Sequence, residues 1–233
     1  RTVPATAAKP QGLSELPSEV EVAIVGAGFS GVAMGAKLRR AGREDFVVLE
    51  RAADPGGTWR DNDYPGCACD VPSHVYSFSF APNPDWSSTF SPQPEIRDYI
   101  RDVAEREGGA VEQARRRLRQ RRAGAQHAGH QQQPLHAARS ISSITSSSLV
   151  LRTAEGELRA RVLVAAAGPF SPPKMPAVAG LERFRGTVFH SAEWDHDHDL
   201  SGERVAVVGT GASAIQFVPQ IQPQVERLHL FQR

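Results

Sequence analysis

The clearest chemistry in this sequence is a glycine-rich turn, in which Gly26, Gly28 and Gly31 follow the spacing GxGxxG. The first glycine permits a tight turn, the second lets the main chain approach a pyrophosphate, and the third allows a helix to pack closely on a strand. A helix that begins in this turn directs free N–H groups and the positive end of its dipole at phosphate oxygens. Glu50 follows at the distance where an acid binds ribose hydroxyls. We therefore predict a dinucleotide site, with a glycine-rich turn of another α/β protein as the alternative.

A second turn of the same kind has Gly209, Gly211 and Ala214 as its three small residues. Two such turns imply two dinucleotides, or one dinucleotide in each of two domains. The strand expected after this second turn ends at Arg233 and not at an acid. An acid would repel a 2′-phosphate and an arginine would bind it, so this end favours NADP over NAD. A solvated terminal arginine is the alternative interpretation.

Two further segments carry residue types that could contact a ligand. Residues 56–59 read Gly-Gly-Thr-Trp, and paired glycines let a loop pass close to a cofactor. Trp59 would then lie over a flat ring system, or it would pack as part of a structural turn. Residues 184–195 form a pattern that no elementary spacing rule predicts, with Phe184, Gly186, His190, Trp194 and Asp195 as its marked positions.

The elements that must position these residues form two βαβ units. Apolar runs bounded by turns predict buried parallel strands, and small or apolar residues at helical spacing predict the helices between them. The expected strands are 20–25, 46–49, 204–208 and 228–231, and the expected helices are 29–41, 94–105 and 212–222. A hairpin from residue 149 leads into an apolar strand that ends at Gly168. The sequence predicts an α/β fold, with a Rossmann-like domain followed by the start of a second Rossmann-like domain.

Domain boundaries follow from changes in composition. Residues 1–18, rich in Pro, Ala and Ser, are expected to be a flexible lead-in, residues 19–180 the first domain, and residues 181–233 a linker with the first half of the second domain. Residues 108–148 are anomalous because they show neither helical nor strand periodicity and include seven arginines. We interpret this segment as a compensated frameshift in a GC-rich gene, with a disordered insertion as the alternative.

Composition excludes several classes of protein. The formal net charge is +1, from 27 basic and 26 acidic residues, which excludes a strongly basic nucleic-acid binder. No apolar run is long enough to span a membrane. Cys67 and Cys69 are too few for a disulfide framework, so a reducing cytoplasm is expected. Their spacing does not suit a zinc or redox motif, and the alternating Asp and His of residues 195–199 lack a further ligand group, so no metal site is predicted.

At residues 184–195 the sequence FRGTVFHSAEWD resembles the fingerprint of the Baeyer–Villiger monooxygenases, FxGxxxHxxxW followed by Pro or Asp. In that family the fingerprint lies between two Rossmann motifs, as it does here. Residues 56–80 resemble the family's flavin-proximal segment, and LVAAAG at 163–168 resembles the return of the chain after the meander of the FAD domain. The resemblance covers residues 19–107 and 149–233, and its motifs are specific in combination but not singly.

The resemblance implies a role for each residue that matches a motif. Gly26, Gly28, Gly31 and Glu50 would bind the ADP half of FAD, Gly57, Thr58 and Trp59 would lie along the flavin and its pyrophosphate, and Gly209, Gly211, Ser213 and Arg233 would hold NADPH. Asp70 would orient an arginine near the flavin, with a buried loop cap as the alternative. His190 and Trp194 would lie in the linker that couples cofactor movement to catalysis, and the alternative for His190 is a hydrogen-bonded linker residue without a chemical role.

The family chemistry implied is the oxidation of a ketone. NADPH reduces FAD, O₂ adds at flavin C4a, and the resulting peroxide inserts one oxygen atom into the ketone to give an ester or lactone. The expected partners are a small ketone and O₂, without nucleic acid or membrane. The family's flavin-side arginine lies beyond residue 233, so the chain is expected to be an N-terminal fragment that is inactive alone. The alternatives are an N- or S-oxygenating flavin monooxygenase and a non-catalytic dinucleotide-binding fragment, and Trp194-Asp195 favours the ketone oxidiser.

Overall fold

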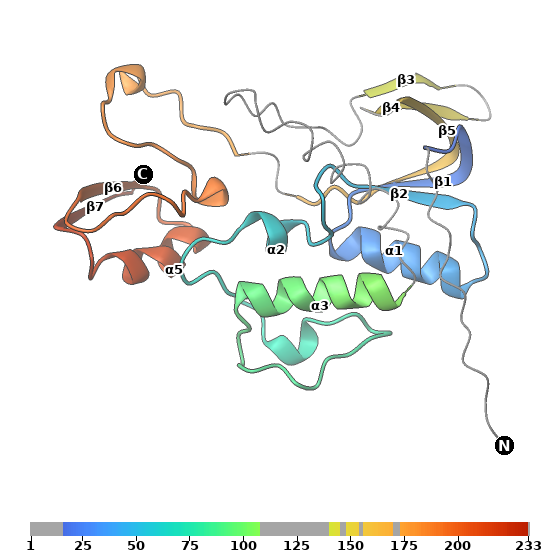
Figure 1. The fold of residues 1–233 in the computed structure, drawn as a ribbon, viewed down its shortest axis with the longest axis horizontal. Helices are drawn as coiled ribbons and strands as arrows, with labels where there is room; N and C mark the ends of the chain where they lie inside the picture. The colour runs from blue at the N-terminus through green and yellow to red at the C-terminus, as the bar shows by residue number, and fades with distance from the viewer. Residues whose placement is uncertain (1–15, 108–139, 145–147, 154–155, 170–172, 233) are drawn as a thin grey trace.

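The computed structural model describes residues 16–107, 140–144, 148–153, 156–169 and 173–232 (Figure 1). Arg233, most of the expected lead-in and most of the anomalous segment 108–148 lie outside the described residues. The predictions made for those parts of the chain, including the arginine contact with a 2′-phosphate, stay predictions.

Helices and strands alternate along the described chain as the hydrophobic pattern predicts. The strands are β1 (Glu19–Val25), β2 (Phe46–Leu49), β3 (Ser140–Ile144), β4 (Leu149–Thr153), β5 (Gly156–Ala165), β6 (Arg204–Val208) and β7 (Arg227–Phe231). The helices are α1 (Phe29–Arg40), α2 (Thr58–Asp61), α3 (Gln93–Arg106) and α5 (Ala212–Ile221), with 3-10 turns at Ser73–Val75, Leu181–Arg183 and Ser191–Glu193. The three predicted helices end within one residue of the observed bounds, whereas α2 lies in a stretch that we expected to contain only loops and short turns.

The first unit is built on a five-stranded sheet in the order β2-β1-β5-β4-β3. Strands β2, β1 and β5 run parallel, and β4 and β3 continue the sheet as an antiparallel meander. Because the carboxyl ends of parallel strands meet at one edge, the turn after β1, Glu50 after β2 and Ala166 after β5 are brought together there.

Strand β3 corrects the expected absence of regular structure at residues 140–144, whereas the interpretation of residues 108–148 as a frameshift or a disordered insertion stays a prediction. We expected no regular structure before residue 149, yet Ser140–Ile144 pairs antiparallel with β4. The register shifts between Ile141 and Ser143, and such an irregularity removes the strict period of two that a strand search relies on. The alternation was therefore absent from the sequence although the main-chain pairing is present.

The main core lies between this sheet and the helices α1 and α3, which lie on the same face of the sheet in Figure 1, and it continues into the second unit through buried residues of β6 and α5. Ile24 of β1 and Val48 of β2 are almost fully buried there. Helix α3 buries Ile96, Ile100 and Val103, all at 0% exposure, because this spacing places them on one face of a helix. The opposite face of the sheet has a smaller cluster of buried residues.

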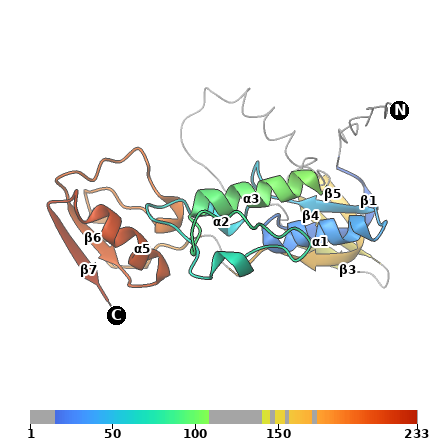
Figure 2. The same ribbon diagram turned by 90° about the horizontal axis from the view of Figure 1, so that it is seen from below.

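The second unit is smaller and consists of the parallel pair β6 and β7 with helix α5. Figure 2 shows it at one end of the molecule, with the meander of the first unit toward the other end. No helix of the described residues is both long and apolar enough to cross a membrane.

Candidate dinucleotide sites and the linker between them

The turn after β1 has the geometry that its glycines predict. Gly26 has φ +104°, and a Cβ there would lie 2.4 Å from the carbonyl oxygen of Ala166. A Cβ on Gly31 would lie 1.8 Å from the carbonyl oxygen of Gly26. The first glycine is therefore required by the close approach of β5, and the third by the packing of helix α1 on the turn itself.

The second glycine of this turn faces another glycine-rich loop. A Cβ on Gly57, at φ +52°, would lie 3.0 Å from Cα of Gly28. The N–H of Gly56 donates to the carbonyl of Ala27 at 2.9 Å, so the two main chains run side by side. Gly28 caps α1 without a side-chain hydrogen bond, and the first turn of α1 has no acidic residue. The positive end of this helix is thus presented to an anion beside two glycine main chains.

Glu50 lies at the same edge, and its carboxylate stabilises the turn directly. Oε2 accepts the N–H of Ala27 at 2.7 Å, and Oε1 accepts the N–H of Ala52 at 3.0 Å. Arg60, from α2, lies 3.1 Å from Oε1, and the two side chains are only 13% and 6% exposed. A carboxylate oxygen has two lone pairs, and the one described hydrogen bond to Oε2 uses one of them. Arg60 was not predicted, because no spacing rule relates it to Glu50.

Trp59 differs from the residue that we expected to lie open along a flavin. Its side chain is 8% exposed, and its ring meets that of Tyr76 at 5.7 Å in an edge arrangement. The indole N–H donates to the Tyr76 hydroxyl at 2.9 Å, and the Gln93 amide donates to the Trp59 carbonyl. The structure favours the packed alternative, in which Trp59 fixes the loop that contains Gly57 and Thr58, and a flavin contact of these three residues stays a prediction.

Asp70 lies at the end of the same loop and is exposed, so the buried-cap alternative for this residue is wrong. Its neighbour Cys69 is 4% exposed and donates its N–H to the carbonyl of Ser91 at 2.9 Å. Burial raises the pKa of the Cys69 thiol, and that of Cys67 for the same reason. Both thiols are therefore held in their protonated form, and Asp70 is an exposed carboxylate beside them.

The second turn is similar in form but more open than the first. Gly209 has φ +111°, and a Cβ on either Gly209 or Gly211 would meet no atom within 4 Å. Gly211 caps α5, whose first turn contains no acidic residue. Ala214 is 8% exposed and packs where the motif requires its third small residue. Ser213 is partly buried in the first turn of α5, where an anion would approach.

The linker contributes His190 and Trp194. The Ala192 N–H donates to Nδ1 of His190 at 3.1 Å, so this side chain caps a 3-10 turn. A neutral imidazole that accepts at Nδ1 carries its proton at Nε2. The Trp194 ring lies 5.1 Å from that of Phe217 on α5 and 5.2 Å from that of Phe189. His190 is thus hydrogen-bonded within the linker, its part in catalysis stays a prediction, and Trp194 packs the linker onto the second unit.

The alternating acids and histidines after Trp194 are held by separate partners. His196 pairs with Asp63 of the first unit at 3.1 Å, and His198 pairs with Glu203 at 3.0 Å. Asp199 accepts hydrogen bonds from Ser201, which lower the pKa of its carboxyl group. Among the residues that the structure describes, no group of three or more such side chains is placed to hold a metal ion.

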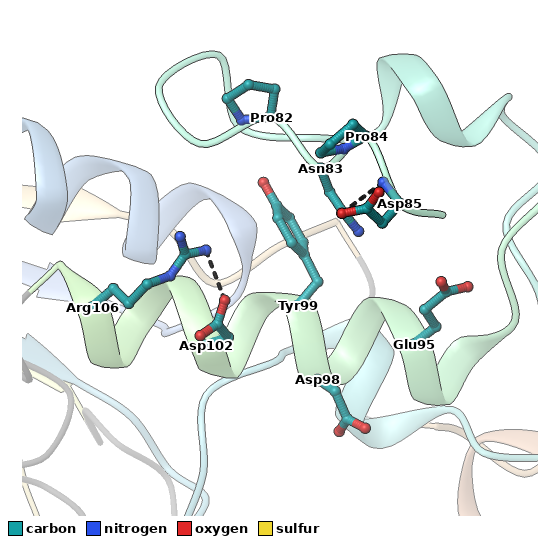
Figure 3. A pocket seen from close by; sticks show the side chains of 9 residues that line it. All are labelled: Pro82, Asn83, Pro84, Asp85, Glu95, Asp98, Tyr99, Asp102 and Arg106. Atoms are coloured by element: carbon teal, nitrogen blue, oxygen red, sulfur yellow. Dashed lines mark hydrogen bonds and ion pairs between the residues drawn. The ribbon is translucent and has the colours of Figure 1, made fainter. Parts of the chain in front are cut away.

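A surface hollow beside α3 is separate from both glycine turns. It has a volume of about 440 Å³ and lies between α3 and the loop 82–85 (Figure 3). Most of its charged side chains are acids, and its one arginine, Arg106, pairs with Asp102 at 2.7 Å. None of the predicted site residues lines it, so it is not the predicted dinucleotide site.

Comparison with known families agrees with this geometry. Residues 24–101 match the family described as NAD(P)-binding Rossmann-like domain, and residues 84–232 match the family described as pyridine nucleotide-disulphide oxidoreductase. A Baeyer–Villiger monooxygenase of Streptomyces coelicolor is 52% identical over 94% of this chain, and one of Pseudomonas aeruginosa is 47% identical over 91%. The chain belongs to the Baeyer–Villiger monooxygenase family.

Solved structures of this family share the fold. An oxidised steroid monooxygenase bound to NADP superposes with a TM-score of 0.75 at 37% identity, over 92% of this chain and 39% of that protein. A cyclohexanone monooxygenase superposes with a TM-score of 0.72 at 32% identity, over 91% of this chain and 39% of that protein. This Baeyer–Villiger family chain spans 39% and 37% of the length of the two bacterial relatives.

Proposed function

We propose that this chain supplies the FAD-binding unit and the start of the NADPH-binding unit of a monooxygenase that inserts one oxygen atom of O₂ into a ketone. The observation that carries the proposal is the pair of glycine turns, each at the N-terminus of a helix, joined by a linker that contains His190 and Trp194. Two relatives that are 52% and 47% identical to this chain are named Baeyer–Villiger monooxygenases.

The first unit presents a helix N-terminus and glycine main chains at the motif that we expect to bind FAD. The main chains of Gly28 and Gly57 face each other at the positive end of α1, which suits a pyrophosphate. Glu50 lies at the position where this motif has an acid for the ribose hydroxyls. The residues present therefore fit this cofactor, and Gly211 with Ser213 fit the pyrophosphate of NADPH at α5.

Bound FAD, reduced by NADPH, supplies the activation of O₂. The chain's own residues bind and orient. The N–H groups of α1 and α5 hold phosphates, and Trp59 fixes the loop next to the first of these sites through its hydrogen bond to Tyr76. The exposed Asp70 carboxylate is accessible to a cationic group that would stabilise an oxyanion. His190 presents Nε2–H as a donor from the linker.

The length of the chain bears on its activity, because the family's flavin-side arginine is expected in the remaining part of the longer relatives. Val208 of β6 is 75% exposed and Ile215 of α5 is 70% exposed, whereas the strands of parallel sheets are usually covered on both faces. We therefore expect the 233-residue chain to bind FAD without oxidising a ketone.

The test is a titration of the purified chain with FAD, followed by quenching of flavin fluorescence, and a titration with NADP⁺ by calorimetry. Saturable binding of both is expected, whereas binding of neither would overturn the proposal. NADPH-dependent lactone formation by the 233-residue chain would overturn its expected inactivity. Protein expressed from the gene with any in-frame continuation, offered a cyclic ketone and a sulfide together, would separate ketone oxidation from N- or S-oxygenation by the product formed.

A further inference from the structure

The first unit and helix α5 are joined by the side-chain amide of Gln216. Its Oε1 accepts the N–H of Ala68 at 3.2 Å, and its Nε2 donates to the carbonyl of the same residue at 2.9 Å. The hydroxyl of Tyr64 donates to Oε1 at 3.0 Å. Both main-chain groups of one loop residue are thus satisfied by one side chain, as a neighbouring strand would satisfy them. Neither an ionised carboxylate, which has no proton, nor a leucine, which has neither group, can accept and donate in this way.

The packing around this amide leaves the loop little freedom to move apart from α5. Gly66 has φ +77°, and a Cβ there would lie 2.9 Å from the main-chain oxygen of Gln216. The ring of Tyr64 lies 6.0 Å from that of Phe217, and its side chain is 7% exposed. Burial raises the pKa of Tyr64 to about 12, so its hydroxyl keeps the proton that it donates.

Each end of this contact leads to one of the two dinucleotide sites. Gln216 is on the helix that begins at Gly211, in the second glycine turn. Ala68 is two residues before Asp70, and its loop begins at α2, directly after Gly57 in the first site. A displacement of α5 along its axis would therefore pull on the segment that contains Asp70, because hydrogen bonds at both groups of Ala68 resist sliding.

We propose that Gln216 is a positioning residue that couples occupation of the second dinucleotide site to the placement of the flavin-side loop from Gly57 to Asp70. The proposal rests on the proposed function, because it assumes that FAD and NADP bind to the two glycine turns. An anion bound at the N-terminus of α5 draws that helix toward it, and Gln216 carries this displacement to Ala68. By reciprocity, FAD in the first site must change the affinity of the second site for NADP by the same factor.

The experiment measures the dissociation constant of FAD for the 233-residue chain with and without saturating NADP⁺. For the wild-type chain, we expect the dissociation constants of FAD without and with NADP⁺ to differ by a ratio of about tenfold. This ratio is within the usual range for coupling between two binding sites. In Gln216→Leu and in Gln216→Glu the ratio should fall below about twofold, because neither side chain can donate to the Ala68 carbonyl. The matched control is Gln222→Leu, an exposed glutamine at the end of the same helix, which should keep the wild-type ratio.

Hydrogen exchange gives a second measurement, independent of any activity. Added NADP⁺ should slow exchange of the Ala68 N–H in the wild-type chain and leave it unchanged in Gln216→Glu. The N–H of Cys69, which donates to Ser91, serves as the internal reference for a folded loop. The inference would be overturned if both Gln216 variants kept the wild-type ratio of FAD dissociation constants. It would also be overturned if NADP⁺ did not change the FAD affinity of the wild-type chain. A chain that binds neither dinucleotide would overturn the proposed function as well, so the two failures are distinguishable.

Discussion

Replacing Gly31 by alanine should be the most informative single perturbation of the first site. The new Cβ would lie 1.8 Å from the carbonyl oxygen of Gly26 and 2.9 Å from its carbonyl carbon. Both are main-chain atoms of the turn, so no flexible side chain can move aside. The overlap can be relieved only if α1 moves away from β1, which would displace the helix N-terminus that we expect to hold the pyrophosphate of FAD.

The expected cost is about 3 kcal/mol of unfolding free energy, at the upper end of the range for overpacked positions, because main chain meets main chain. A chain of this length should then unfold about 6–12 °C lower than the wild type. Urea denaturation followed by circular dichroism measures the free energy. Quenching of flavin fluorescence measures the dissociation constant of FAD, which should rise by at least about tenfold, equivalent to about 1.4 kcal/mol.

Gly35→Ala provides the matched control on the same helix. Its Cβ would lie 3.4 Å from the Phe46 ring and 3.5 Å from a methyl group of Val48, which is ordinary contact. Alanine is the better helix former by about 1 kcal/mol, so this variant should be neutral or slightly more stable and should bind FAD as the wild type does. If the unfolding free energies of Gly31→Ala and Gly35→Ala differed by less than about 1 kcal/mol, the steric reasoning for the third glycine would be refuted.

Three further changes test other parts of the molecule. Glu50→Gln should lower the unfolding free energy by about 2 kcal/mol and weaken FAD binding, because it removes the buried charge partner of Arg60, and an unchanged urea midpoint would contradict this role. Trp194→Ala should cost about 2 kcal/mol through the loss of two ring contacts, whereas Trp194→Phe should retain most of the stability, and equal losses would show that the rings do not matter. Arg40 lowers the pKa of Glu107 below its usual 4.5. The pair therefore contributes stability above that pH, and this stability is lost as the pH falls through the lower pKa that Glu107 has in the folded chain. Glu107→Gln should therefore flatten the acid side of a stability–pH curve, and an unaltered slope below pH 4.5 would count against the pair.

The local sequence pattern was sufficient to predict both βαβ units and the glycines of the turn in each unit. The apolar runs of β1 and β2 and the spacing in α3 predicted elements to within one residue, because strands and helices bury faces with their own period. Gly26 and Gly31 were identified by type, since a turn that must admit close main-chain contact excludes a Cβ. Strand β3 was missed because its register shift removes the alternation.

By itself, therefore, the sequence determined the two βαβ units and their glycine turns, which depend on short-range spacing, and its motifs carried the resemblance to the family. Only the tertiary structure decided that Arg60 neutralises Glu50, that Trp59 is packed away from solvent, and that Gln216 holds Ala68. Gln216 and Ala68 are 148 residues apart, and no local period relates residues at such a distance. Their pairing exists because the linker, packed through Trp194, brings α5 against a loop whose main-chain groups required partners.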